Sequence, residues 1–221
     1  MFSNLFSKKY YKIECISETP RLSSSKFGGV PYCKSLDEIP CDSEGKRMTL
    51  LVQINFDEVK VPLSFGLKHG MLQFFISTKG TSYGADFSNL LNKSGFRVIY
   101  HEAVDYSVTE AQVLSYGLPE GHGNSSTPVQ TSCKIKLFSV KQKDNKGSHI
   151  FGTPLFCQED PRPTKPEYSS KKYDTLLLQI DSCATKGHVE FGDQGIAHFF
   201  INRKALERKD FADILYTWDC Y

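Results

Sequence analysis

Apolar and polar positions alternate along two nearly identical stretches of the chain. TLLVQINF occupies residues 49–56 and TLLLQIDS occupies residues 175–182, each with a glutamine inside an apolar run. Alternation with a period of two is typical of a half-buried β-strand. Two further stretches, MLQFFI at 71–76 and IAHFFI at 196–201, are almost continuously apolar, which is typical of strands covered on both faces. These four stretches predict a strand-rich protein.

Other segments recur in the same order in both halves of the chain. FGGVP at 27–31 returns as FGTP at 151–154, and VIY at 98–100 returns as ILY at 214–216. The two glutamine stretches are 175 − 49 = 126 positions apart, close to the shift of 151 − 27 = 124 for the Phe-Gly segments. Segments that recur in order at similar shifts indicate an internal duplication.

The duplication predicts how the chain is organised. We expect a single domain over residues 1–221, made of two repeats at about 22–116 and 147–221 and joined by a loop region at 117–146. Each repeat would cover the apolar face of the other about a pseudo-two-fold axis. The loop region contains GLPEGHGNSSTP, whose Gly, Pro, Ser and Asn residues favour a connection.

Helical signals are short and follow residues that favour helix N-termini. Ser35, Thr109 and Asn202 each stand where a side-chain oxygen could accept a backbone hydrogen bond at the start of a helical turn. Together with the strand patterns, these signals predict an α+β fold that is β-rich. We expect internally duplicated units with a mixed or antiparallel sheet in each half and short helices.

Composition and charge argue against several classes of partner. The 221 residues include 27 basic and 25 acidic side chains, spread along the chain for a net charge of +2. No basic stripe of the kind that follows a phosphate backbone is present, so we expect no nucleic-acid partner. We expect no membrane partner either, since no run of 18 apolar residues occurs. The N-terminal sequence lacks a secretory pattern, which favours a cytoplasmic location.

Cysteine and histidine spacings give no sign of a metal or cofactor. The seven cysteines show no C-x-x-C pair, and the six histidines form no H-x-H or H-x-x-x-H pair. Neither G-x-x-x-x-G-K-[ST], nor G-x-G-x-x-G, nor G-x-S-x-G occurs. We therefore expect reduced thiols, no bound metal and no cofactor.

Several of these motifs together resemble the YwqG-like family, a domain of unknown function. They are FGGVP at 27–31, QINF at 53–56, GMLQFFI at 70–76 and WDC at 218–220, and the resemblance covers about residues 25–221. The second Phe-Gly segment departs from the family pattern, because GTP stands where Gly-Gly-x-Pro is usual. The resemblance implies a duplicated α+β fold, but it implies no particular reaction.

Five side chains are candidates for binding a ligand. Gln53 and Gln179 hold equivalent places in the first pair of strands, and Gln73 and His198 hold equivalent places in the second pair. Trp218 is the only tryptophan and could form a shelf for a ligand. The structural alternative is that the amides and the imidazole satisfy buried backbone groups, and that the indole packs in the interior.

Catalysis is the competing hypothesis. A hydrolase- or lyase-like enzyme could use His198, Asp193 and Asp219 in a pocket between the repeats, which requires these side chains to converge. Asp193 stands between Gly192 and Gln194, in a pattern equally typical of a plain turn.

Because the sequence contains no recognisable catalytic motif, we expect a non-enzymatic binding or interaction module. Its working surface would lie at the seam between the two repeats, and its partner would be a small polar ligand or another protein. A second alternative is an immunity-type inhibitor that covers the active site of a toxin.

Overall fold

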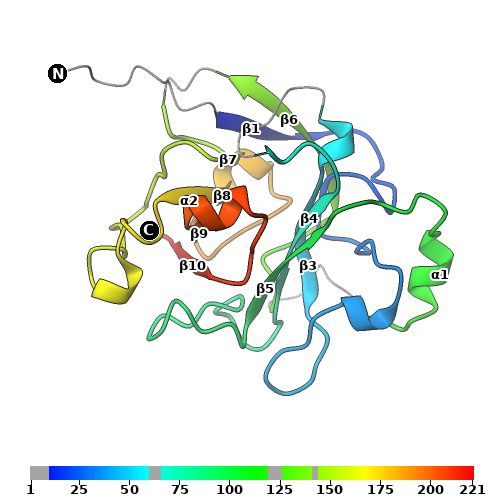
Figure 1. The fold of residues 1–221 in the computed structure, drawn as a ribbon, viewed down its shortest axis with the longest axis horizontal. Coiled ribbons are helices and arrows are strands. Elements are labelled where there is room, and N and C mark those ends of the chain that lie inside the picture. The colour runs from blue at the N-terminus through cyan, green and yellow to red at the C-terminus, as the bar shows by residue number, and fades with distance from the viewer. Residues whose placement is uncertain (1–9, 60–65, 119–125, 141–143) are drawn as a thin grey trace.

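The computed structural model describes residues 10–59, 66–118, 126–140 and 144–221 (Figure 1). Its strands form one sheet of ten, in the order β10-β9-β8-β7-β1-β6-β2-β3-β4-β5. Every pairing within this sheet is antiparallel. The strands are β1 (Tyr10–Ile16), β2 (Lys26–Phe27), β3 (Thr49–Asn55), β4 (Met71–Ile76), β5 (Phe96–His101), β6 (Cys133–Val140), β7 (His149–Ile150), β8 (Thr175–Asp181), β9 (Ile196–Ile201) and β10 (Ile214–Asp219).

Helices contribute little to the described chain. The α-helices α1 (Glu110–Leu114) and α2 (Arg203–Glu207) have five residues each. The prediction of an α+β fold with a sheet in each half is therefore wrong: the protein is β-rich, with one sheet shared by both halves. The sequence indicates where a helix begins but not where it ends. For example, α2 ends at Glu207, shortly before Lys209 takes a left-handed φ of 58°. The described residues also form short 3-10 helices: η1 (Leu36–Glu38), η2 (Phe56–Glu58), η4 (Pro166–Tyr168) and η5 (Ser182–Thr185).

The residues before α1 and η1 differ in whether their side chains cap the helix, and this difference should be measurable as a difference in stability. The Thr109 side chain accepts a hydrogen bond from the backbone of Gln112 at the start of α1, whereas the Ser35 side chain makes no such bond before η1. We expect Thr109→Ala to lower the free energy of unfolding by about 1 kcal/mol. Ser35→Ala is the matched control and should change it by less than about 0.5 kcal/mol. Urea denaturation measures both, and equal effects would contradict the assignment of Thr109 as a cap.

The two ends of the sheet follow the same plan. β2, β3, β4 and β5 lie in sequence at one end, β7, β8, β9 and β10 lie in sequence at the other, and β1 and β6 join them. The pairing of β3 with β4 is interrupted between Leu50 and Val52, and that of β8 with β9 between Leu176 and Leu178, at the same distance before each glutamine. The two glutamine stretches therefore form strands with the same irregularity.

The region at 117–146, predicted as a loop between repeats, contains one of the two joining strands. β6 pairs with β2 on one side and with β1 on the other. Residues 119–125 and 141–143 of this region lie outside the described part of the chain. The connection thus adds a strand to the sheet as well as linking the two halves.

The sequence match between FGGVP at 27–31 and FGTP at 151–154 differs by one residue from the match that the strand pairing gives. Lys26 of β2 and His149 of β7 pair with the glutamines of β3 and β8, so these two residues are equivalent. Phe151 then corresponds to Gly28 rather than to Phe27. Both residues have a left-handed φ, 56° for Gly28 and 62° for Phe151. A non-glycine residue therefore takes the conformation for which the first half uses glycine.

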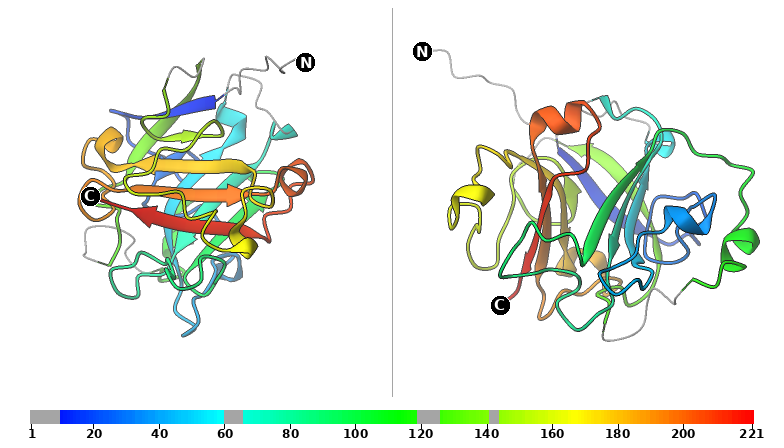
Figure 2. Two further views of the ribbon diagram at one scale, coloured as in Figure 1. Left: turned by 90° about the vertical axis from the view of Figure 1, so that its left-hand side faces the viewer. Right: turned by 60° about the horizontal axis from the view of Figure 1, so that its bottom comes forward.

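The sheet curls until its two ends face one another, giving a nearly closed barrel (Figure 2). Aromatic side chains from both ends fill the space between them. The rings of Phe74 and Phe199 lie 4.8 Å apart, and those of Phe96 and Tyr216 lie 5.1 Å apart. One continuous hydrophobic core therefore draws on both halves of the chain.

Long connections cover the outer faces of the curled sheet. Met71 and Phe75 of the first half pack against residues such as Tyr32 and Val113, which come from segments outside the sheet. In the second half, Leu176, Phe200 and Leu215 pack in the same way against Leu90, Tyr168 and Tyr173. Strands β4 and β9, each second from an end of the sheet, are consequently buried along their whole length, as their continuous apolar sequences predict.

The connection between β4 and β5 closes the seam where the ends of the sheet approach each other. The backbone of Leu90 accepts a hydrogen bond from the backbone of Tyr216 in β10 at 3.2 Å. The Tyr216 hydroxyl donates to the carbonyl of Tyr83 at 2.9 Å, and the Trp218 indole donates to the carbonyl of Ser82 at 2.7 Å. The outer edge of β10 is thus covered by a loop from the first half rather than left open.

Candidate functional site

Gln53 joins its strand to the segment that covers it. The side-chain carbonyl accepts a hydrogen bond from the backbone of Tyr32 at 3.1 Å, and the amide nitrogen donates to the carbonyls of Leu22 and Ser24, each at 2.7 Å. The neighbouring Gln73 donates to the carbonyl of Tyr32 at 2.8 Å. All these bonds lie within the first half, so this amide pair anchors a covering segment.

Gln179 makes the corresponding bonds in the second half. Its carbonyl accepts from the backbone of Leu155 at 2.8 Å, and its nitrogen donates to the carbonyls of Asn145 at 3.0 Å and Gly147 at 2.8 Å. His198 replaces the second amide, with Nε2 lying 2.7 Å from the carbonyl of Leu155. Both glutamines, Gln73 and His198 are fully buried, so a ligand could reach them only after the covering segments move.

Burial also determines the charge of His198. Desolvation lowers its pKa to about 3, despite the hydrogen bond to Leu155. The ring is therefore neutral at pH 7, and it packs against Phe156 with ring centroids 4.4 Å apart. Nδ1 of His198 is buried and has no hydrogen-bond partner among the described residues.

The other two side chains of the catalytic hypothesis lie in different surroundings. Asp219 is half-buried and its Oδ2 accepts a hydrogen bond from the backbone of Gln158 at 2.7 Å, while desolvation raises its pKa. Asp193 is exposed in the turn before β9. In the described part of the chain, no hydrogen bond links Asp193, Asp219 or His198 to another of the three. The catalytic role of these residues stays a prediction.

Trp218 lies at the seam, partly exposed and surrounded by other aromatic rings. Its ring centroid is 5.4 Å from that of Tyr83 and 5.4 Å from that of Phe87. Phe87 is 56% exposed, so this pair presents an apolar surface to solvent. The indole nitrogen is already engaged by Ser82, which leaves the faces and edges of the rings for contact with a ligand.

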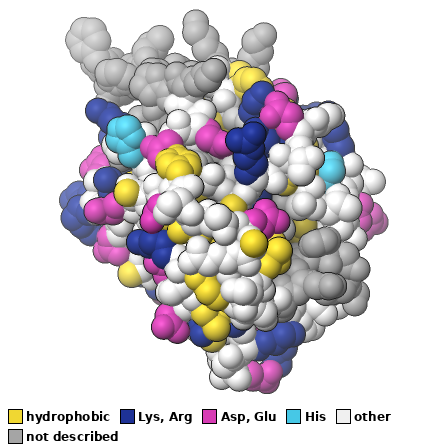
Figure 3. All heavy atoms as spheres, turned by 90° about the vertical axis from the view of Figure 1, so that its right-hand side faces the viewer, with side chains coloured by type: hydrophobic (Ala, Val, Ile, Leu, Met, Phe, Trp, Pro, Cys, Tyr) yellow, Lys and Arg dark blue, Asp and Glu magenta, His cyan; other side chains and the backbone are white. Residues whose placement is uncertain are grey.

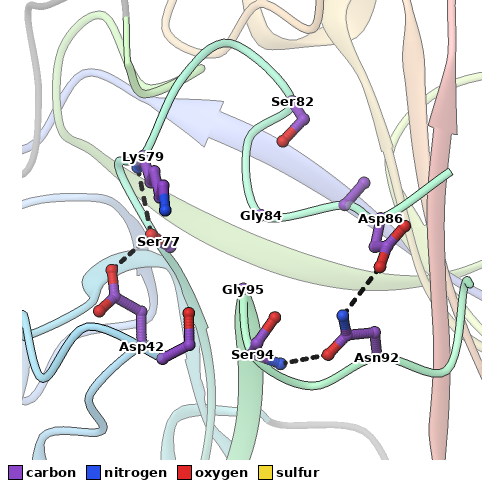
Figure 4. Close-up of a pocket in the computed structure, with 11 residues that line it drawn as sticks. Asp42, Ser77, Lys79, Ser82, Gly84, Asp86, Asn92, Ser94 and Gly95 are labelled. Atoms are coloured by element: carbon purple, nitrogen blue, oxygen red, sulfur yellow. Dashed lines mark hydrogen bonds between the residues drawn. The ribbon is translucent and has the colours of Figure 1, made fainter. Parts of the chain in front are cut away.

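A polar pocket of about 130 Å³ lies in the same connection between β4 and β5 (Figure 4). Ser82 belongs both to the pocket and to the contact with Trp218, so the pocket adjoins the seam. The residues that line it are Asp42, Ser43, Ser77, Lys79, Ser82, Gly84, Ala85, Asp86, Asn92, Ser94 and Gly95.

Two carboxylates of the pocket are held ionised. Hydrogen bonds from Ser88 and Asn92 lower the pKa of Asp86 to about 2. Desolvation opposes ionisation of Asp42, but a 2.8 Å hydrogen bond from the Ser77 hydroxyl and bonds from two backbone amides outweigh it and lower the pKa. Both side chains are therefore hydrogen-bond acceptors at neutral pH.

Three hydroxyls of the pocket remain available. Within the described chain, the side chains of Ser43, Ser82 and Ser94 make no hydrogen bond to protein groups, and Figure 4 shows Ser82 and Ser94 reaching into the space from opposite sides. Lys79 adds a cationic donor and also pairs with Glu44. The pocket thus combines acceptors, donors and hydroxyls, which can do both.

The pocket residues were not among the sequence candidates. Most of them lie in STKGTSYGADFSNLLNKSG at 77–95, whose Gly, Ser and Asn content indicates a loop but not a site. Asp42 joins them from a segment outside this loop, and only the fold brings it to Ser77. Among the described residues, Trp218 is the one candidate that a hydrogen bond joins to a residue lining the pocket.

The fold and the pocket define a β-rich domain of one curled antiparallel sheet, with a small polar pocket beside its seam. The chain belongs to the family described as domain of unknown function DUF1963, whose model matches residues 25–220. A comparison with curated proteins gives no match. Among the described residues, no helix has the length and apolar character needed to cross a membrane.

Proposed function

We propose that the protein is a binding module whose pocket at the seam takes the hydroxyl groups of a small polyol or monosaccharide. The observation that carries this proposal is the pocket of about 130 Å³, whose lining combines ionised carboxylates with hydroxyls that have no partner among the described residues. A sugar hydroxyl both donates and accepts hydrogen bonds, so it complements Asp86, Ser82 and Ser94 at the same time. A pocket of this size holds one edge of such a ligand rather than a larger molecule.

The exposed aromatic pair supplies the second part of the binding surface. Trp218 is bonded to the pocket residue Ser82, and Phe87 directly follows the pocket residue Asp86. An apolar ring face beside a polar pocket suits a ligand with one polar edge and one C–H face. The proposal therefore places the working surface at the seam and includes Trp218 in it.

Ligand-detected saturation-transfer NMR tests this function with glycerol, myo-inositol, ribose and glucose as probes. We expect at least one of them to receive saturation from the protein. Ser82→Ala and Ser94→Ala should each weaken its binding about threefold to tenfold, the usual effect of one lost hydrogen bond. Ser170→Ala, in an exposed turn of the second half, is the matched control. The proposal fails if no probe binds, or if binding is unchanged in both pocket variants.

The organisation and setting of the module are part of the same proposal. Matched strand order supports two repeats at about 22–116 and 147–221, and the quoted motifs support a YwqG-like member of the family. All seven cysteines are unpaired, which supports a reducing, cytoplasmic compartment. On the face in Figure 3, basic and acidic side chains are interspersed, which supports a partner other than a nucleic acid.

A further inference from the structure

Three soft metal-binding side chains converge away from the pocket. The ligand atoms of Cys15, Cys133 and His188 all lie within 4.8 Å of one another. Cys15 lies near the end of β1, Cys133 begins β6, and His188 lies in the loop between η5 and β9. β1 and β6 are paired neighbours in the sheet (Figure 1), so two of the ligands stand on regular secondary structure.

This spacing is close to that of a tetrahedral metal site. With Zn–S bonds of about 2.3 Å, two thiolates on one zinc ion are about 3.8 Å apart. Closing the three side chains around an ion therefore requires shifts of about 1 Å, which side-chain rotation supplies. Thiolate and imidazole ligands together favour zinc over magnesium or calcium, which prefer oxygen.

We propose that Cys15, Cys133 and His188 form a site for one Zn²⁺ ion, with the fourth coordination position open to water. Three protein ligands and one open position are the arrangement of exchangeable and catalytic zinc sites, whereas structural sites use four protein ligands. Cys15 and His188 are partly exposed while Cys133 is buried. The ion would thus enter from solvent and bind the buried thiolate last.

The surroundings of His188 orient it for this role. The Thr131 hydroxyl lies 2.6 Å from Nδ1 of His188, which leaves Nε2 to bind the ion. The backbone carbonyl of His188 also accepts a hydrogen bond from Gln130 at 2.8 Å, and a bridge between Val129 and Val189 holds the two segments together. Metal-bound histidines commonly have their second nitrogen fixed in this way.

Zinc binds the thiolate form of cysteine, so binding of the ion would release one proton from each of Cys15 and Cys133. Two thiolates then balance the charge of the ion.

Metal binding would fasten the joining strands β1 and β6 to the second half of the chain. Cys15 and Cys133 belong to the joining strands, whereas His188 follows the glutamine strand of the second half. In the structure, the Cys15 thiol already donates a 3.7 Å hydrogen bond to the carbonyl of Thr185 in that half. Saturating Zn²⁺ should accordingly raise the Tm of the full chain.

Cobalt provides the spectroscopic test. The full-length protein, kept reduced with a phosphine, is titrated with Co²⁺, which takes the place of zinc and reports thiolate ligands through near-ultraviolet charge-transfer bands. We expect these bands, with tetrahedral d–d bands in the visible, to saturate at one ion per chain and to disappear when Zn²⁺ displaces Co²⁺. Absence of the charge-transfer bands in the reduced wild-type protein would overturn the proposal.

Variants assign the ligands. Cys15→Ser and His188→Gln, both at partly exposed positions, should raise the apparent Kd for Co²⁺ at least about tenfold. Cys183→Ser is the matched control, because its exposed thiol contacts Gln194 outside the cluster, and it should leave the titration unchanged. Circular dichroism checks that each variant is folded. Unaltered binding in Cys15→Ser and His188→Gln, or loss of binding in Cys183→Ser, would contradict the assignment.

Discussion

Replacing Gln53 by methionine should lower the free energy of unfolding by about 3–5 kcal/mol, the largest effect we expect from a single side chain here. The methionine keeps the volume but removes the bonds to the backbone of Tyr32, Leu22 and Ser24. These groups are buried with the side chain, and a buried group without a partner costs about 1–3 kcal/mol. Urea denaturation should show a lower midpoint with an unchanged slope.

Two comparisons isolate the cause of this loss. Gln179→Met should be destabilising to a similar extent, since its amide makes equivalent bonds in the second half. Gln130→Met is the control: that side chain is partly exposed and makes one long bond of 3.5 Å to the carbonyl of Pro128, so we expect a change below about 0.5 kcal/mol. If Gln53→Met costs no more than Gln130→Met, the anchoring role of the glutamines is wrong.

The glutamine strands show what the sequence can predict. Alternation around Gln53 and Gln179, and the continuous apolar runs near Gln73 and His198, predict four strands that the structure contains. The alternation also predicts that the glutamine strands are half-buried, which is wrong, because β3 and β8 are buried on both faces. Strand patterns can be recognised locally, because successive side chains of a strand point to opposite faces of the sheet. The prediction of an α+β fold is wrong because residues such as Thr109 and Asn202 indicate where a helix begins but do not determine its length.

Neither the pocket nor the cysteine cluster has a local pattern. Asp42 and Ser77 meet because β3 and β4 pair and bring their flanking loops together. Cys15, Cys133 and His188 stand on β1, β6 and a distant loop, so no ligand spacing can be recognised in the sequence. The cysteine cluster depends on sheet order, in particular on the joining strands β1 and β6, which the repeat pattern does not reveal.

His198→Gln should make the protein less sensitive to acid. Burial lowers the folded-state pKa of His198 to about 3 from an ordinary value of 6.5. As the pH falls below 6.5, the unfolded chain takes up a proton that the folded chain refuses, so folding stability decreases between pH 6.5 and 3. At pH 5 this one group should cost about 2 kcal/mol relative to pH 7. Glutamine carries no charge, and Gln73 already fills the equivalent place in β4.

Urea denaturation at pH 7 and pH 5 checks this expectation. The drop in unfolding free energy between the two pH values should be smaller in His198→Gln than in the wild type by about 2 kcal/mol. Some acid sensitivity should remain, because desolvation also lowers the pKa values of the buried His149 and the partly buried His101. His69→Gln is the matched control, since that imidazole is 81% exposed. An equal drop in the wild type and in His198→Gln would show that His198 can be protonated without unfolding, so that the covering segment at Leu155 opens locally.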